Sequence, residues 1–143
     1  MSKSNTWENA LLALLFNATP MANVADNATS GPLTNLYVSL HTADPGEGGN
    51  QISNETNYTS YARVAVARSG SGWTVSGNQV TNAVDIVFPA STGGTSTVTH
   101  FAVGTDASGA GRLLYKGALT TPLTITTGVQ PRFEANALTI TED

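Results

Sequence analysis

The chain has 143 residues, of which 11% are charged, and its 6 basic and 10 acidic residues give a net charge of −4. This length predicts a single domain that can bury a core. The absence of cysteine excludes disulfides, thiolate nucleophiles and cysteine-ligated zinc, and the absence of a basic cluster argues against nucleic-acid binding. Thr, Ser, Asn and Gly must supply most of the surface. Such a surface costs little to desolvate, which favours a protein that works inside an assembly.

Residues 1–20 predict the only helix, an N-terminal amphipathic arm. Its apolar stripe at helical spacing consists of Trp7, Ala10, Leu11, Leu14, Leu15 and Ala18, widened by Leu12 and Phe16. Asn5 and Glu8 resemble a capping box, and Pro20 is expected to stop the helix. The stripe could pack on this chain's own sheet or on a neighbouring subunit. The apolar run is too short to span a membrane, and Glu8 and Asn9 argue against a signal peptide.

Residues 21–35 are rich in Ala, Asn, Ser and Gly and are interpreted as a linker. The rest of the chain, 36–143, is expected to form a β-domain. Apolar residues alternate at 36–41, 61–67 and 80–88, and further short strands are expected at 73–75, 97–103, 112–119, 123–126 and 138–141. Ser76-Gly77-Asn78 predicts a hairpin turn. Seven or eight short strands separated by turns predict an antiparallel β-sandwich or jelly-roll.

The long polar loop 42–58 is the best candidate for a contact surface, because a loop of this length in a compact domain is usually functional or mobile. Its Asp44, Glu47 and Asn50 could be read as calcium ligands. Their spacing does not match a specific calcium motif, so a solvated turn is the favoured interpretation and no metal or cofactor is expected.

The sequence contains only two histidines, His41 and His100, and each lies within a strand pattern. Ser39 and His41 share a strand face and, with Asp44, could be drawn as a hydrolytic set. No feature of the sequence marks an oriented base or an oxyanion pocket, so we expect structural histidines and no enzyme.

Three aromatic residues, Tyr37, Tyr61 and Trp73, could form a platform for a sugar. They stand in separate strands, so core or interface packing is the favoured interpretation. Asp85 stands between Val84 and Ile86 and is expected to point to solvent while the alternate residues Val84, Ile86 and Phe88 share a face.

Five blocks in order carry a resemblance to a known family: LYVSLHTADP at 36–45, YARVAVARSGSGW at 61–73, VTNAVDIVFPA at 80–90, THFAVGTDASGAGRLLYKGALTTP at 99–122 and the closing ALTITED. Together they resemble small virion structural proteins of tailed bacteriophages, often labelled tail fibre proteins. The similarity covers nearly the whole chain from Leu36 onward, and the N-terminal helix also fits. None of the blocks is a catalytic motif.

The resemblance implies a non-enzymatic virion component present in many copies, with a homo-oligomer expected. We favour a capsid decoration (cement) protein that binds the major capsid protein or other virion proteins, because the chain lacks a long repetitive shaft. The alternative is a tail-fibre, tail-tip or head-fibre component, with binding of host glycans as a further option. The expected interface residues are Trp7, Leu11, Leu14, Leu15, Asp44, Glu47 and Tyr58. If the arm makes this contact, deleting residues 1–20 should leave a folded β-domain that no longer binds the particle.

Overall fold

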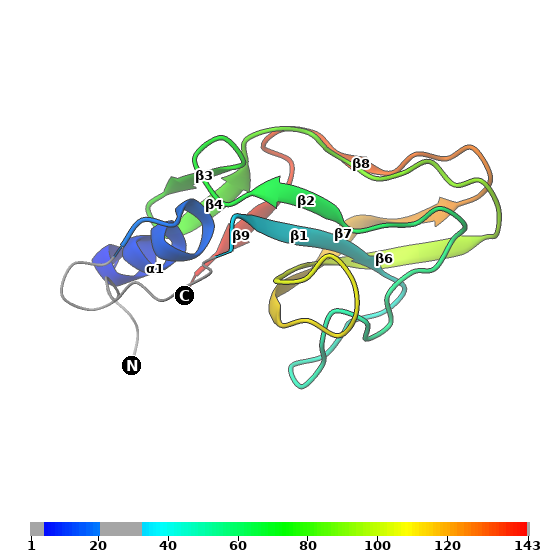
Figure 1. Ribbon diagram of the computed structural model, residues 1–143, viewed down its shortest axis with the longest axis horizontal. Helices are drawn as coiled ribbons and strands as arrows, with labels where there is room; N and C mark the ends of the chain where they lie inside the picture. Colours follow the sequence, from blue (N-terminus) through cyan, green and yellow to red (C-terminus); the bar gives the residue numbers. More distant parts are fainter. Residues whose placement is uncertain (1–4, 21–32, 143) are drawn as a thin grey trace. The chain divides into compact units, whose positions relative to one another are not determined.

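A computed structural model describes residues 5–20 and 33–142, with only the backbone described for Asn5 and Trp7. Most of the expected linker, residues 21–32, therefore lies outside the described residues. The chain forms two compact units, each built from separate segments: unit 1 comprises Met1–Asn35, Val66–Asp85 and Phe133–Asp143, and unit 2 comprises Leu36–Ala65 and Ile86–Arg132. Each unit is described by itself below, with the elements as labelled in Figure 1.

Helix α1 (Asn5–Asn17) packs on strands β3 (Trp73–Ser76) and β4 (Gln79–Asn82) of unit 1. Its buried residues are Glu8, Leu12 and Phe16, which lie four residues apart and therefore on one helix face. The Phe16 ring meets the Trp73 ring edge-on, with centroids 4.7 Å apart. The buried face of α1 differs from the predicted apolar stripe. Leu11, Leu14 and Leu15, which belong to the predicted stripe, are only half-buried. The helix thus packs on its own chain through the residues that were expected only to widen the stripe.

The carboxyl end of α1 is closed by backbone geometry and by one arginine. Ala18 takes a left-handed conformation (φ 54°), and the Thr19 N–H donates to the Ala13 carbonyl at 3.0 Å. Arg68 donates from Nε to the Leu15 carbonyl and from Nη2 to the Leu14 carbonyl, both at 2.5 Å. A cation at this end of a helix also complements the helix dipole. The helix therefore ends at Asn17, before Pro20 is reached.

Strands β3 and β4 form the predicted hairpin, and β9 (Thr139–Thr141) pairs antiparallel with β4. Ser76 pairs with Gln79, which leaves Gly77-Asn78 as a two-residue turn, and Gly77 has the positive φ (62°) that such a turn requires. Val80, Leu138 and Ile140 join Trp73 in the buried core of this unit.

Buried Asn82 divides the single strand that was expected at 80–88. Its Nδ2 donates to the carbonyls of Val84 and Glu134, each at 2.8 Å, and its Oδ1 accepts from the Leu138 N–H at 2.9 Å. β4 therefore ends at Asn82, and β5 (Ile86–Val87) begins beyond a bend. The expectation that Val84 shares a buried face with Ile86 is wrong, because Val84 is 48% exposed. Asp85 is exposed, as predicted, and accepts from the Ala135 N–H.

Unit 2 contains the four-stranded antiparallel sheet in the order β2-β1-β6-β7 (Figure 1). Its strands are β1 (Asn35–His41), β2 (Val64–Ala67), whose last two residues pass into unit 1, β6 (Ser96–Gly104) and β7 (Leu113–Ile125). The alternation predicted for β1 is present: Val38 lies opposite Val103 and Leu40 opposite Phe101, and all four are buried. Ser39 and His41 point to the other face and are buried too.

Strand β7 runs unbroken through the two strands that were expected at 112–119 and 123–126. It lies at the edge of the sheet, and its register against β6 shifts between Val98 and His100, where Pro122 falls among the residues without a partner. An edge position tolerates Pro because its missing N–H is not needed there. Pro122, Lys116 and the register shifts also discourage pairing of this edge with another strand.

The remaining short strand, β8 (Arg132–Phe133), pairs with β5. The prediction of an all-β fold with antiparallel sheets and one short N-terminal helix is confirmed, and it is consistent with a sandwich. The jelly-roll form stays a prediction. Within the part of the chain that the structure describes, every helix is too short or too polar to cross a membrane.

Candidate interaction surface

The loop predicted to make contacts, 42–58, folds back over the polar face of the sheet in unit 2. The Thr42 N–H donates to the Asn54 carbonyl at 2.8 Å, and the Thr56 N–H donates to the Leu40 carbonyl at 2.9 Å. Asn54 takes a left-handed conformation (φ 56°), and its Nδ2 donates to the Asp44 carbonyl at 2.9 Å. These bonds close the loop on itself and tie its base to β1.

Fully buried Gln51 fixes this loop to a second one, 105–111. Its Oε1 accepts from the Asp106 N–H at 2.9 Å, and its own N–H donates to the Ala110 carbonyl at 2.8 Å. Two glycines make room for the amide: a Cβ at Gly104 would lie 2.2 Å from Gln51 Cδ, and one at Gly111 would lie 1.9 Å from Gln51 Oε1. We call the surface formed by loops 42–58 and 105–111 the loop surface.

An ion pair between Arg63 and Glu55 joins the same two loops. Arg63 donates from Nε and Nη2 to the two oxygens of Glu55 at 2.7 and 2.8 Å, and from Nη1 and Nη2 to the carbonyls of Asp106 and Gly109. The Tyr61 hydroxyl donates to Glu55 Oε1 at 2.8 Å and accepts from the Leu40 N–H. The side chains of Arg63 and Glu55 are only 2% and 13% exposed, so the pair is largely shielded from water. The hydrogen bond to Glu55 raises the pKa of Arg63.

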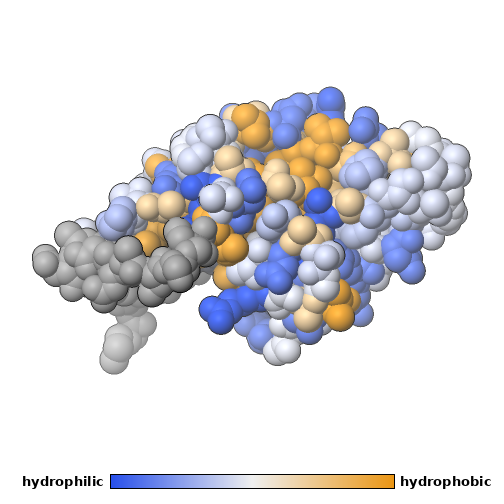
Figure 2. All heavy atoms as spheres, viewed as in Figure 1, coloured by the Kyte–Doolittle hydropathy of each residue, from blue (hydrophilic) through white to orange (hydrophobic). Residues whose placement is uncertain are grey.

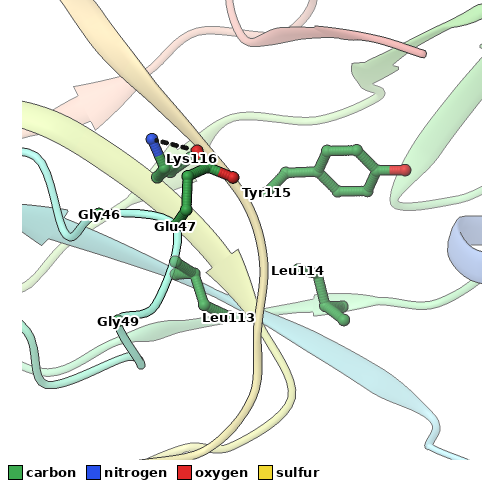
Figure 3. Close-up of a pocket in the computed structure, with 7 residues that line it drawn as sticks. All are labelled: Gly46, Glu47, Gly49, Leu113, Leu114, Tyr115 and Lys116. Carbon is green, nitrogen blue, oxygen red and sulfur yellow. Dashed lines mark ion pairs between the residues drawn. The ribbon is translucent and has the colours of Figure 1, made fainter. Parts of the chain in front are cut away.

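A second cluster of charges lies where loop 42–58 meets β7. Lys116 Nζ lies 3.0 Å from both Asp44 Oδ1 and Glu47 Oε1. The Gly46 N–H, and next Lys116, lower the pKa of Asp44, while Glu47 and Asp44 raise the pKa of Lys116. Figure 3 shows Lys116 turned toward Glu47, with Tyr115 on the other side of the strand. Lys116 and Tyr115 point to opposite sides because successive residues of a strand alternate between its two faces.

These residues line an open pocket of about 280 Å³ between the loop and the strand (Figure 3). Its walls are Gly46, Glu47 and Gly49 from the loop and Leu113, Leu114, Tyr115 and Lys116 from β7. Lys116 pairs with both carboxylates at the edge of the pocket, so one net negative charge remains there, and the pocket offers a partner both apolar and polar contacts.

The calcium interpretation of Asp44, Glu47 and Asn50 finds no support in the geometry. Lys116 engages both carboxylates, and Asn50 Oδ1 accepts from the Ile52 N–H at 3.1 Å. Across residues 5–20 and 33–142, no three His, Cys, Asp or Glu side chains are grouped so that they could hold a metal ion.

Ser39 and His41 form a buried hydrogen-bonded pair. His41 Nδ1 lies 2.9 Å from the Ser53 carbonyl, which can only accept, so Nδ1 carries the proton. His41 Nε2 therefore accepts from Ser39 Oγ at 2.8 Å. Burial lowers the pKa of His41 and keeps the ring neutral. Because both side chains are fully buried, the pair ties loop 42–58 to β1 and presents no nucleophile to a substrate.

The expected interface residues have different surroundings. Asp44 and Glu47 are exposed on the loop surface, whereas Leu11, Leu14 and Leu15 are half-buried on α1; the side chain of Trp7 lies outside the described residues. Tyr58 is a correction: it is only 3% exposed, its hydroxyl donates to the Pro89 carbonyl, and its ring packs edge-on against Tyr61. Its place at the end of the polar loop 42–58 gives no sign that the core of unit 2 covers it.

Two of the three aromatic residues considered for sugar binding, Trp73 and Tyr61, are packed within their own units, and the third, Tyr37, is half-buried on β1. Trp73 is fully buried against Phe16 in unit 1. Tyr61 stacks on Phe88 in unit 2, with ring centroids 6.4 Å apart. Neither ring offers a free face of the kind that a sugar platform needs.

Sequence reasoning missed the residues that build the loop surface, namely Gln51, Arg63 and Lys116. It also missed Ile52, a large apolar side chain that is 54% exposed on this surface. The one available signal was Lys116, the only charge between Leu113 and Pro131. Gln51 depends on a partner 55 positions away, Asp106, which no local pattern reveals. Arg63 depends on carbonyls 43 and 46 positions away, although its ion-pair partner Glu55 lies only 8 positions away.

Comparison with protein-family models finds a match over nearly the whole chain. The model of the family described as "Podophage GP4 fiber I protein gp80" matches residues 2–141. No curated protein matches the chain. The family match spans both units and nearly the whole sequence, so it covers α1 as well as the strands. The chain therefore belongs to the podophage GP4 fibre I protein gp80 family, a family of fibre-type virion proteins.

Proposed function

We propose that this chain is a structural subunit of a phage fibre and that the loop surface of unit 2 binds another virion protein. The observation that carries the proposal is the family match over residues 2–141. The family is one of structural fibre proteins and not of enzymes. The burial of Ser39 and His41 supports a structural role for the one pair of side chains that resembles a hydrolytic set.

The geometry supports the loop surface as the contact. Gln51 and Arg63 hold its two loops in one arrangement, so little conformational entropy is lost when a partner binds. Ile52 supplies an exposed apolar side chain, and the pocket beside Lys116 can receive a side chain of the partner. Rigid loops with one apolar anchor and satisfied charges are well suited to a permanent structural contact.

The family match favours a fibre component over the capsid decoration expected from the sequence. A compact chain without a repetitive shaft suits capsid decoration. Compactness does not decide the location, because a fibre can also be assembled from compact subunits placed end to end.

We expect the N-terminal helix to contribute less to the proposed contact than the sequence suggested. α1 places Leu12 and Phe16 in the core of unit 1, so we expect deletion of residues 1–20 to destabilise this unit rather than remove only a binding arm. The half-buried Leu11, Leu14 and Leu15 stay candidates for contact with a partner.

Immunogold labelling of intact particles tests the location. Antibodies against the purified chain should label fibres, and labelling spread over the head surface would instead support decoration. A second test supplies variants in trans to a phage that lacks the gene. Ile52→Glu, on the loop surface, should reduce incorporation into particles, whereas Val84→Glu, a matched exposed residue in unit 1, should not. Equal incorporation of both variants would contradict the loop surface as the contact.

A further inference from the structure

His41 is a buried link between β1 and the longer of the two loops that form the loop surface. Its side chain is fully buried and both ring nitrogens are bonded. Nδ1 donates to the carbonyl of Ser53, a residue of loop 42–58, and Nε2 accepts from Ser39 Oγ on β1. In this arrangement the ring is neutral and carries its one proton on Nδ1. The neutral ring therefore joins the loop to the strand.

A second proton on the ring would disturb this arrangement. Nε2 would become a donor that faces Ser39 Oγ, so the Ser39 hydroxyl could no longer donate to the ring. The other bonding partner of this hydroxyl is the Ala102 carbonyl, which lies 3.5 Å away, beyond the usual length of such a bond. Protonation of His41 would thus weaken the bonding of Ser39 and place a charge in a fully buried site.

The charged groups around His41 oppose a positive ring on balance. Glu55 of the loop favours it, but this carboxylate is already paired with Arg63. Arg63 opposes a charge on the ring, and so does His100, which lies directly opposite His41 on β6. Burial is the largest of these effects and lowers the pKa of His41.

The other attachments of this loop respond little to mild acid. Gln51 and the backbone bonds at the base of the loop contain no ionisable group. Lys116 has a raised pKa and Asp44 a lowered one, so their ion pair persists. Arg63 also has a raised pKa and stays charged. Histidine is the side chain whose charge ordinarily changes between pH 5 and 8, so mild acid acts on this loop through His41.

We propose that His41 is a pH-dependent switch of the loop surface: protonation of its ring releases loop 42–58 from β1. Release exposes the ring to water, where a second proton is accepted at the ordinary pKa. The outside of the loop is already hydrophilic, because in Figure 2 the loops of this surface lie at the lower centre of the view, where blue and pale residues predominate.

The consequence of this release extends to both loops of the loop surface. Gln51 and Arg63 hold the two loops together, so release of loop 42–58 disturbs the whole contact surface. The inference rests on the proposed function, since it makes the proposed contact with another virion protein weaker in acid.

The size of the effect follows from linkage. Because the pKa of His41 is lowered in the closed loop, the open loop binds the second proton more strongly, and acid favours the open loop. A ring that takes this proton at about pH 6.5 when the loop is open, and stays neutral when it is closed, raises the ratio of open to closed loop about tenfold between pH 7.5 and 5.5. This tenfold change is the upper limit for one histidine.

Hydrogen exchange of the purified full chain at pH 7.5 and 5.5, corrected for the pH dependence of intrinsic exchange, measures the opening. The reporters are the amides of Gln51 and Thr56, which donate to the carbonyls of Ala110 and Leu40. We expect their protection to fall severalfold in acid and to stay below that of the amides bonded between β1 and β6, because the loop opens while the sheet stays folded. His41→Gln, whose side chain does not titrate, should remove most of this pH dependence.

The matched control is His100→Gln, which removes the other histidine of the chain and leaves His41 in place. This variant should keep the pH dependence of the wild type. It also assigns the two histidine signals in NMR spectra, so the His41 ring can be titrated directly in the wild type even if His41→Gln fails to fold. We expect the ring to titrate below its ordinary value of about 6.5.

Four outcomes would overturn the inference: loop amides equally protected at both pH values, loop amides as protected as those between β1 and β6, a His41→Gln variant with the pH dependence of the wild type, or a His41 ring that titrates at or above its ordinary value. All four measurements use the purified chain alone. Their failure therefore leaves the incorporation and immunogold tests of the proposed function unaffected.

Discussion

Replacing Arg63 with Met tests whether the buried ion pair holds the loop surface together. The substitution keeps an apolar stem of similar length but removes the two bonds to Glu55 and the bonds to the carbonyls of Asp106 and Gly109. Glu55 would then keep the Tyr61 hydroxyl as a donor but would lack a cation, in a site where its side chain is 13% exposed.

Removing one partner of a buried ion pair typically costs about 3–5 kcal/mol. Because Glu55 retains some contact with water, we expect the lower value, about 3 kcal/mol. For a chain of this size that corresponds to a decrease in Tm of about 10 °C. Thermal and urea unfolding, followed by circular dichroism, would measure the change.

The two single variants, Arg63→Met and Glu55→Met, and the double variant Arg63→Met/Glu55→Met form a double-mutant cycle. Because no charge is then left unpaired, it should cost about 2 kcal/mol less than the sum of the two single variants. Hydrogen exchange should also show faster opening of loop 105–111 in Arg63→Met than in the wild type. A cost below about 1 kcal/mol for Arg63→Met, or additive single variants, would refute the reasoning.

Three further predictions concern single residues. Arg68→Met should lower stability by about 1–2 kcal/mol in urea unfolding, because the carbonyls at the end of α1 lose a charged donor. Ala18→Gly should raise stability by about 1 kcal/mol because it relieves a left-handed alanine, whereas the mid-helix control Ala13→Gly should lower it. Burial lowers the pKa of His41, so its contribution to stability is complete above about pH 6.5 and is lost as the pH falls below that value. The decrease in Tm from pH 7.5 to 5 should therefore be smaller in His41→Gln than in the wild type.

Local patterns predicted the elements whose structure depends on nearby residues. The alternation of Leu36, Val38 and Leu40 predicts β1 because successive strand side chains point to opposite faces. Gly77-Asn78 predicts the hairpin because its turn needs a positive φ. The helical spacing of apolar residues predicts α1, although the face that it buries depends on where Trp73 lies.

The ends of the strands and the burial of polar side chains depend on the tertiary structure. Asn82 ends a strand because its amide finds partners more than 50 residues away, at Glu134 and Leu138. β7 continues through Pro122 because it is an edge strand of its sheet. The pattern of apolar residues in the sequence does not distinguish an edge strand from a central strand. The sequence gives no sign that Arg63 or Gln51 is buried, because a polar side chain is read as exposed until its partners are known.

By itself the sequence determined the secondary-structure type, the antiparallel β-class and the low charge of the surface, since these depend on residue identity and on spacing within a few positions. Only the tertiary structure decided which polar residues are buried and that two loops are held together by Gln51 and Arg63. The physical reason is that a buried polar or charged group is stable only when its hydrogen-bonding partners are present, and many of these lie more than 40 positions away along the chain.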